Sequence, residues 1–209
     1  MIWSSIFFGC WSKAEPVVER SLELTEPGQE VLEAAMKAVN KISEADSKNY
    51  SIVTIVDMTM HSSTKRLWTI DLNTEEVLYN LAVSHGRGSD SDHDGMLDTV
   101  GNVRESGKTS VGLYKTAETY SGKHGYSLRL DGLEKGFNDN ARKRAIVVHG
   151  ADYVNDAFLK KYGKSGRSLG CPAVSEAVSA EFIDTIKDGT LYFIYADDST
   201  WLKESVYLQ

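Results

Sequence analysis

Cysteine and proline are scarce in this sequence, and it has no long hydrophobic run. The chain of 209 residues contains two cysteines, Cys10 and Cys171, so it can form one disulfide at most. Its three prolines and the lack of any low-complexity tract leave little room for a long disordered linker. The apolar stretch at residues 1–11 is too short to span a bilayer. The sequence thus excludes a disulfide-rich scaffold and favours one folded domain with short extensions.

Basic residues are outnumbered as well. The chain has 23 lysines and arginines against 30 aspartates and glutamates, which gives a net charge of −7. This balance argues against nucleic acid as the main partner, because a polyanion attracts basic surfaces. Hydrophobic residues make up 41% of the chain and charged residues 25%, which is typical of a globular protein with a sizeable core.

One of the two cysteines lies in a segment suited to expose its side chain. Cys171 is followed by Pro172, which favours an extended backbone, and preceded by Gly170, which can adopt a positive φ. Such a turn can leave the backbone N–H groups of Leu169, Gly170 and Cys171 unpaired and pointing the same way. We therefore expect an oxyanion hole formed by the backbone of the turn, with Ser168, Leu169 and Gly170 as its candidate residues.

A base and a cation lie within reach of this cysteine in the sequence pattern. His149 ends an apolar run, 145–148, that reads as a buried strand and is followed by Gly150. A histidine at a strand end and a cysteine on a turn can form a thiol nucleophile with its base. Arg167 places a permanent positive charge four residues before Cys171, which would favour the thiolate. The residue types alone also allow the alternative that Cys171 is a buried structural cysteine unrelated to His149.

A wider series of motifs surrounds these residues and occurs in a fixed order, at residues 83–88, 120–128, 132–141, 149–153 and 166–174. The series resembles the signature of bacterial cell-wall L,D-transpeptidases, and most of all the murein L,D-transpeptidase catalytic domain family, over residues 50–196. The chain departs from many members at Leu169, where they carry His, and at Ala173 and Val174, where they carry Arg.

The resemblance implies a reaction and a substrate. Cys171, with His149 as its base, would attack the carbonyl before the terminal D-alanine of a peptidoglycan tetrapeptide and pass the acyl group to an amine. No metal or cofactor is expected, since the two residues lack the further Cys or His neighbours of a zinc site. An L,D-carboxypeptidase or peptide hydrolase, or an inactive peptidoglycan-binding module, remain alternatives. The candidate substrate-binding residues are Arg167, His124, Tyr153 and Lys123.

The expected fold class is α+β and mainly β: an antiparallel β-sandwich with a few peripheral helices. Strands are predicted at 52–56, at 68–72 and 77–83 as a hairpin, near 109–114, at 145–149 and at 191–195. Helical spacing predicts one helix through residue 45 and another after Ser175. The predicted organisation is a leader with a loose segment at 1–24, a helix at 25–47, the catalytic domain at 48–197 and a loosely attached tail at 198–209.

Three local patterns carry further expectations. The leader, with a Phe-Gly-Cys ending at Cys10, resembles the end of a lipoprotein signal but lacks the positively charged start of a secretory signal, so a truncated signal and an unprocessed apolar tail are alternatives. Mainly from the family resemblance, we expect an exported periplasmic or cell-envelope protein, for which membrane attachment through the leader or a lipidated Cys10 is one possibility. The segment 90–98 matches the first half of an EF-hand loop but has Gly101 at the twelfth position, so a solvated acidic loop is preferred over calcium binding. The basic run 142–144 is interpreted as a solvated face, at least for its first two residues.

Overall fold

The chain folds around one curved sheet of eight strands. The computed structural model describes residues 25–209, and within them the strand order is β3-β2-β1-β8-β4-β5-β6-β7. The strands are β1 (Ile52–Asp57), β2 (Lys65–Asp71), β3 (Val77–Ala82), β4 (Gly112–Gly122), β5 (Gly125–Gly132), β6 (Val147–Ala151), β7 (Ala173–Ser175) and β8 (Leu191–Tyr195). The helices are α1 (Gln29–Asp46), α2 (Asp156–Tyr162), α3 (Glu176–Ile186) and α4 (Ser199–Glu204), with short 3₁₀ helices η1 (Arg87–Ser89) and η2 (Asp152–Val154).

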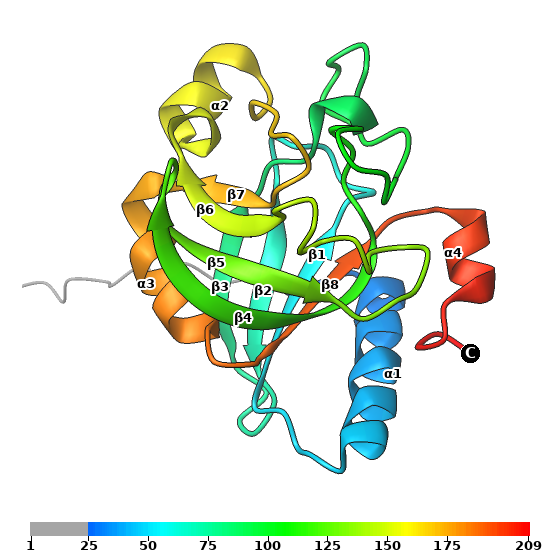
Figure 1. The fold of residues 1–209 in the computed structure, drawn as a ribbon. Coiled ribbons are helices and arrows are strands. Elements are labelled where there is room, and N and C mark those ends of the chain that lie inside the picture. Colours follow the sequence, from blue (N-terminus) through cyan, green and yellow to red (C-terminus); the bar gives the residue numbers. More distant parts are fainter. Residues whose placement is uncertain (1–24) are drawn as a thin grey trace, which may run out of the picture.

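The sheet folds over on itself into a near-barrel. Most neighbouring strands are antiparallel, but β1 pairs with β8 and β6 pairs with β7 in parallel. In Figure 1, β4, β5 and β6 cross in front of β1, β2 and β3. The two ends of the sheet meet where the backbone N–H of Ser84, just after β3, donates to the carbonyl of Ala173 in β7, at 2.9 Å. The predicted mainly β class with peripheral helices is confirmed, and the two layers belong to one continuous sheet.

The strands arise where branched and aromatic residues are concentrated. In β1 the five residues after Ile52 are buried, and every residue of β8 is buried, which fits its place in the middle of the sheet. The predicted hairpin is present as β2 and β3, and its turn is supported by the Asp71 carboxylate, which accepts from the backbone N–H of Asn73 at 2.8 Å.

Two of the helices, α1 and α3, pack on the sheet through one apolar face each. α1 buries a stripe that runs from Val31 to Ile42 at helical spacing, and α3 buries Phe182, Ile183 and Ile186. In Figure 1, α1 and α3 lie on different sides of the sheet, and α2 lies beyond β6 and β7. Because α3 begins directly after β7, the apolar face of α3 helps to hold the short strand in place beside β6.

The C-terminal segment is anchored, which corrects the prediction of a loosely attached tail. Trp201 in α4 is fully buried, and its indole N–H donates to the Glu134 carboxylate at 3.0 Å. The same ring makes an edge contact with Tyr195. The Asp198 side chain caps α4 by accepting from the backbone N–H of Trp201, at 2.8 Å. A single tryptophan carries no periodic pattern, so its burial was not apparent in the sequence.

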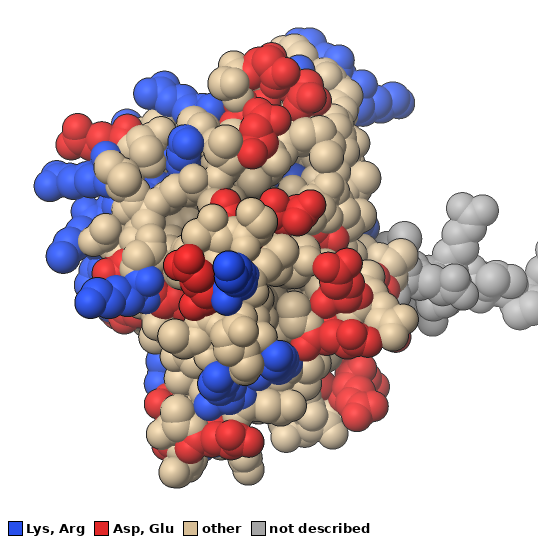
Figure 2. Space-filling model, turned by 90° about the vertical axis from the view of Figure 1, so that its right-hand side faces the viewer, with Lys and Arg blue, Asp and Glu red and all other residues tan. Residues whose placement is uncertain are grey.

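The N-terminal expectations fall outside the described residues. The leader, Cys10 and the loose segment at 1–24 all precede the part of the chain that the structure describes. Within residues 25–209, none of the helices combines the length and the apolar character needed to cross a bilayer. On the face shown in Figure 2, acidic and basic side chains are interspersed.

Candidate active site

Cys171 lies at the end of a tightly braced loop that enters β7. The backbone of Ser168 joins the segment after β3, since its N–H donates to the His85 carbonyl at 2.9 Å and its carbonyl accepts from the Arg87 N–H at 2.8 Å. The Ser168 hydroxyl accepts from the Gly170 N–H at 3.0 Å and donates to the Cys171 carbonyl at 2.7 Å. The loop that carries the thiol is therefore held at both its start and its turn.

Gly170 adopts the positive φ expected from the sequence, at 115°. A Cβ at this position would come within 2.6 Å of the Lys108 carbonyl oxygen, so only glycine fits without moving the backbone. The loop that contains Lys108 is therefore packed directly against the loop that contains Gly170 and Cys171.

The N–H groups predicted to form an oxyanion hole differ in their hydrogen bonding. The Gly170 N–H is already bonded to the Ser168 hydroxyl, which corrects the expectation that it is unpaired. Among the described residues, no hydrogen-bond acceptor is assigned to the N–H groups of Leu169 and Cys171. The side chain of Leu169 is 63% exposed. Two N–H groups, from Leu169 and Cys171, are thus available to a ligand beside the thiol.

The thiol of Cys171 faces the backbone that leads into β6. Its Sγ lies 3.6 Å from the carbonyl oxygen of Ala145. Burial raises the pKa of the Cys171 thiol, and the Val147 N–H and the charge of Arg144 offset part of this rise. The thiol is accordingly protonated at neutral pH in this conformation. A thiol in this state would need a base to act as a nucleophile, because it is not a preformed thiolate.

His149 is a buried side chain in β6 with one ring nitrogen committed. Its Nδ1 lies 2.8 Å from the carbonyl oxygen of Gly150, an acceptor, so Nδ1 carries the proton and donates. Nε2 is then the free acceptor, as a general base requires. Burial lowers the pKa of His149; the Gly150 carbonyl opposes this and the neighbouring His124 adds to it. His149 is therefore neutral, and able to accept a proton, at neutral pH.

The sheet brings the two predicted catalytic residues onto neighbouring segments. His149 is paired with Ala173 in the parallel β6–β7 ladder, and Cys171 lies two residues before Ala173. In the described residues the thiol bonds to the Ala145 carbonyl, and no hydrogen bond joins it to His149.

Of the candidate substrate-binding residues, His124 and Tyr153 lie near His149 or Cys171, whereas Lys123 is exposed to solvent. His124, at the tip of the β4–β5 hairpin, stacks on His149 with ring centroids 4.4 Å apart. The Tyr153 carbonyl accepts from the Gly166 N–H at 2.8 Å, and burial, followed by the nearby Cys171, raises the pKa of the Tyr153 phenol to about 12. Lys123 is exposed at the hairpin tip. His124 and Tyr153 therefore border the site.

Arg167 braces the loop. Its guanidinium donates to the backbone carbonyl of Asp90. Of the two roles that the sequence offers this residue, the observed contact is the bracing one, for which the donors of a guanidinium are well suited.

A buried chain of hydrogen bonds, from Arg66 through His85 to Asp90, supports the loop of Cys171, and sequence reasoning missed it. The Arg66 guanidinium lies 2.8 Å from His85 Nδ1, and His85 Nε2 lies 2.9 Å from the Asp90 carboxylate. Because a guanidinium only donates, Nδ1 must accept and the Nε2 proton must point to Asp90. Burial, followed by the charge of Arg66, lowers the pKa of His85 to about 4. His85 is thus a neutral structural residue whose carbonyl holds Ser168.

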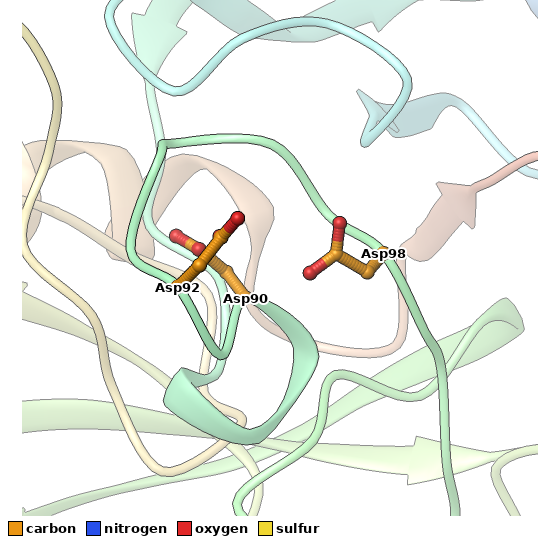
Figure 3. A group of neighbouring side chains, drawn as sticks. All are labelled: Asp90, Asp92 and Asp98. Atoms are coloured by element: carbon orange, nitrogen blue, oxygen red, sulfur yellow. The ribbon is translucent and has the colours of Figure 1, made fainter.

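The acidic loop after η1 is held by its own hydrogen bonds. One oxygen of the buried Asp90 carboxylate accepts from the Asp94 N–H at 3.1 Å, and the other accepts from His85 and from the Gly95 N–H at 3.3 Å. Asp98 approaches from the opposite side of the loop (Figure 3), and one carboxylate oxygen each from Asp90, Asp92 and Asp98 lies within 4.8 Å of the others. Internal hydrogen bonds account for the shape of this loop, and no α-helix flanks it in the described residues.

Arg144 is a further residue near Cys171 whose role sequence reasoning missed. The first residue of the basic run, Arg142, forms ion pairs at the surface with Glu118 and Asp131, as a solvated face predicts. Arg144 instead turns inward, and its charge acts on Cys171. Three adjacent basic residues give no sequence signal for which of them is buried.

Two grooves on the surface lie apart from these residues. One, of about 620 Å³, runs between α1 and the β2–β3 hairpin, and another, of about 610 Å³, lies between β3, α2 and the start of α3. Neither groove is lined by Cys171 or His149.

Comparison with known proteins gives the family. Residues 25–195 match a family model described as the L,D-transpeptidase catalytic domain. No curated protein matches the chain. Among solved structures it is similar to an L,D-transpeptidase from Mycobacterium smegmatis, with 14% identity, a TM-score of 0.42, and coverage of 71% of this chain and 60% of that chain.

Two further solved structures are similar at the same level. An L,D-transpeptidase from Stackebrandtia nassauensis has 14% identity and a TM-score of 0.42, over 82% of this chain and 69% of that chain. An L,D-transpeptidase from Xylanimonas cellulosilytica has 16% identity and a TM-score of 0.39, over 78% and 77%. The chain spans about 60% of the length of the first of these three structures. The family model covers most of the sequence, including both His149 and the loop of Cys171, and the chain therefore belongs to the L,D-transpeptidase catalytic domain family.

Proposed function

We propose that this protein is a cysteine-dependent L,D-transpeptidase that acts on the tetrapeptide stems of peptidoglycan through a thioester acyl-enzyme. The observation that carries the proposal is the arrangement around the thiol. Cys171 sits on a braced loop with two available N–H groups, next to the strand that holds His149 with its Nε2 free. The family to which the chain belongs supports the substrate class.

The two neutral groups require proton transfer during the attack. The thiol leaves the Ala145 carbonyl and gives its proton to His149 Nε2 as Sγ bonds to the substrate carbonyl carbon. The N–H groups of Leu169 and Cys171 hold the resulting oxyanion. Collapse of the tetrahedral intermediate breaks the C–N bond, and His149 protonates the departing amine of D-alanine. An acceptor amine then attacks the thioester carbon and gives a proton to His149. Collapse of the second tetrahedral intermediate breaks the C–S bond, and His149 returns the proton to the departing sulfur, which restores the Cys171 thiol.

The test is incubation of the purified protein with a disaccharide-tetrapeptide, with and without an added D-amino acid, followed by mass spectrometry. We expect loss of D-alanine with formation of either a cross-linked dimer or the D-amino acid adduct. Products that carry only water in place of D-alanine would instead identify an L,D-carboxypeptidase. Binding to peptidoglycan without any product would identify an inactive binding module.

Cys171→Ser is the matched variant for this assay. A serine hydroxyl beside a neutral imidazole is a far weaker nucleophile than a thiol, so turnover should be lost while the fold is kept. The melting temperature and the circular dichroism spectrum serve as the control for folding. Substantial turnover by the Ser variant would remove Cys171 from the mechanism.

The proposed substrate also places the protein. Peptidoglycan lies outside the cytoplasmic membrane, so we propose a periplasmic or cell-envelope location. Fractionation of cells that produce the full chain with a C-terminal tag tests this, and recovery of all the protein in the cytosol would contradict it. A Cys10→Ala variant that moves from the membrane to the soluble envelope fraction would indicate attachment through Cys10.

A further inference from the structure

Arg144 joins a surface loop to the strand that carries His149. It lies in the chain just before β6 and is partly buried. Its Nη1 donates to the Gly101 carbonyl at 2.8 Å and to the Ser110 hydroxyl at 3.2 Å, and its Nη2 donates to the Lys108 carbonyl. All three acceptors belong to residues 101–110, which we call the clamp loop. One guanidinium thus satisfies acceptors at the start and at the end of this loop.

The same guanidinium also touches the nucleophile loop. A Cβ built on Gly170 would lie 3.0 Å from Nη2 of Arg144 and 2.6 Å from the Lys108 carbonyl oxygen. From the other side, a Cβ on Gly86 would lie 2.9 Å from the Gly170 Cα and 2.3 Å from the Gly107 carbonyl oxygen. The clamp loop, the Gly86 turn and the Gly170 turn therefore converge with no space between them, and Arg144 is the charged group at this junction.

Its charge reaches the thiol in a partly dehydrated setting. The side chains that interact electrostatically with the Cys171 thiol are Arg144, from the segment before β6, and Tyr153, from η2, while His149 lies on the neighbouring strand β6. Tyr153 and His149 are neutral at neutral pH, because burial raises the pKa of the former and lowers that of the latter. Arg144 keeps its charge even though burial lowers its pKa. A cation in this position stabilises the Cys171 thiolate, both when the thiol loses its proton and when the sulfur departs from the thioester.

We propose that Arg144 is the positioning residue of the active site, which locks the clamp loop against the Gly170–Cys171 turn and supplies the positive charge that stabilises the thiolate. The proposal rests on Cys171 being the nucleophile of the proposed function. It assigns to Arg144 the charge role that the sequence suggested for Arg167, whose guanidinium is turned to the Asp90 carbonyl.

The test compares three variants by the rate of Cys171 alkylation with iodoacetamide as a function of pH. Arg144→Gln removes the charge, Arg144→Lys keeps the charge and loses the fork, and Arg142→Gln is the matched surface control. We expect the Gln variant at 144 to show a higher alkylation midpoint and a rate at neutral pH that is lower by about threefold or more, because less thiolate is present. The Lys variant should keep a midpoint near that of wild type but lose thermal stability and muropeptide turnover. Arg142→Gln should match wild type.

A folded Arg144→Gln variant with the wild-type alkylation profile overturns the charge role. An Arg144→Lys variant with wild-type melting temperature and turnover overturns the clamp role, and it carries the test if the Gln variant fails to fold. The alkylation assay needs no muropeptide, so the two proposals fail separately. A wild-type protein without activity on muropeptides, combined with a shifted profile in Arg144→Gln, would refute the proposed function and leave the role of Arg144 standing.

Discussion

The imidazole of His124 stacks on that of His149, with ring centroids 4.4 Å apart and ring planes 28° apart. His124 is exposed at the hairpin tip, whereas His149 is buried, so the outer ring covers one face of the inner one. A positive charge on His124 disfavours a second positive charge on His149, which contributes to the lowered pKa of His149. The stack therefore helps to keep the proposed base unprotonated.

Removal of this ring should move the acid limb of the pH–rate profile. The reaction needs neutral His149, so the rate falls when the pH drops below the pKa of that residue. In His124→Ala the neighbouring charge is gone and water reaches His149, and both changes raise its pKa. We expect the acid limb of kcat/KM to move to higher pH. A His124→Ala profile that overlays that of wild type would show that the stack has no effect on the base.

The loss of the base itself should be far more costly. His149→Ala should slow acylation by roughly 10²–10⁴-fold, the usual effect of a lost general base. The measurement is single-turnover formation of the acyl-enzyme, detected by intact-protein mass spectrometry. Alkylation of Cys171 at high pH, where the thiolate forms unaided, is the control that the thiol remains accessible. An unchanged acylation rate would leave His149 with a structural role only.

Arg167→Lys tests the bracing contact to the Asp90 carbonyl. Lysine keeps the charge but cannot reproduce the planar fork, so we expect a lower melting temperature and a lower turnover. Because the Arg167 guanidinium is bonded to the Asp90 carbonyl and the charge that acts on Cys171 is that of Arg144, the pH profile of Cys171 alkylation should stay as in wild type. The control is Arg104→Lys, since the Arg104 side chain is 76% exposed. Equal stability and turnover for Arg167→Lys and wild type would refute bracing.

His85 should make the fold sensitive to acid over a defined range. Its pKa is about 4 in the folded chain against an ordinary 6.5, so the unfolded chain binds the proton first as the pH falls. The stability from neutral His85 is fully present above pH 6.5, declines as the pH approaches 4, and then levels off. Between neutral pH and pH 4, the free energy of unfolding contributed by neutral His85 falls by about 3 kcal/mol at most.

His85→Gln isolates this contribution. A glutamine can still accept from Arg66 and donate to Asp90, but it does not titrate. Urea unfolding of both proteins between pH 7.5 and 4 should show a smaller loss of free energy of unfolding in the variant, by about 3 kcal/mol at most. His149 adds to the loss in both proteins and cancels in the comparison. Identical losses would place the acid sensitivity elsewhere.

Local patterns in the sequence were sufficient to predict some of the regular elements, but not β5, β7, α2 or α4. The branched run at 52–56, the alternation across the β2–β3 hairpin and the apolar run at 191–195 are all strands in the structure. The positive φ of Gly170 also followed from the residue type alone. Each of these features depends on neighbours within a few residues, which is why the order of residue types predicts them.

Other features depend on contacts between residues far apart in the chain, which no local pattern encodes. The loose tail predicted after residue 197 is packed because Trp201 meets Glu134, 67 positions earlier. The inward turn of Arg144 depends on carbonyl acceptors at Gly101 and Lys108, more than 35 positions away.

The sequence by itself determined the family, most of the strands and the pair of residues that we propose for catalysis, because each of these depends on a short ordered motif. The tertiary structure alone decided which neighbours those residues meet. The parallel pairing of β6 with β7 places Cys171 two residues before Ala173, the ladder partner of His149. Burial lowers the pKa of His149 and raises that of Cys171, so both side chains are neutral at neutral pH. The tertiary structure also decided which of the two arginines, Arg144 or Arg167, has its charge near the thiol. Each guanidinium is held by the buried backbone carbonyls that it can bond, because a buried carbonyl without a donor is unfavourable. Arg167 and Arg144 are equally basic in the sequence, and only the folding of the clamp loop over Gly170 distinguishes them.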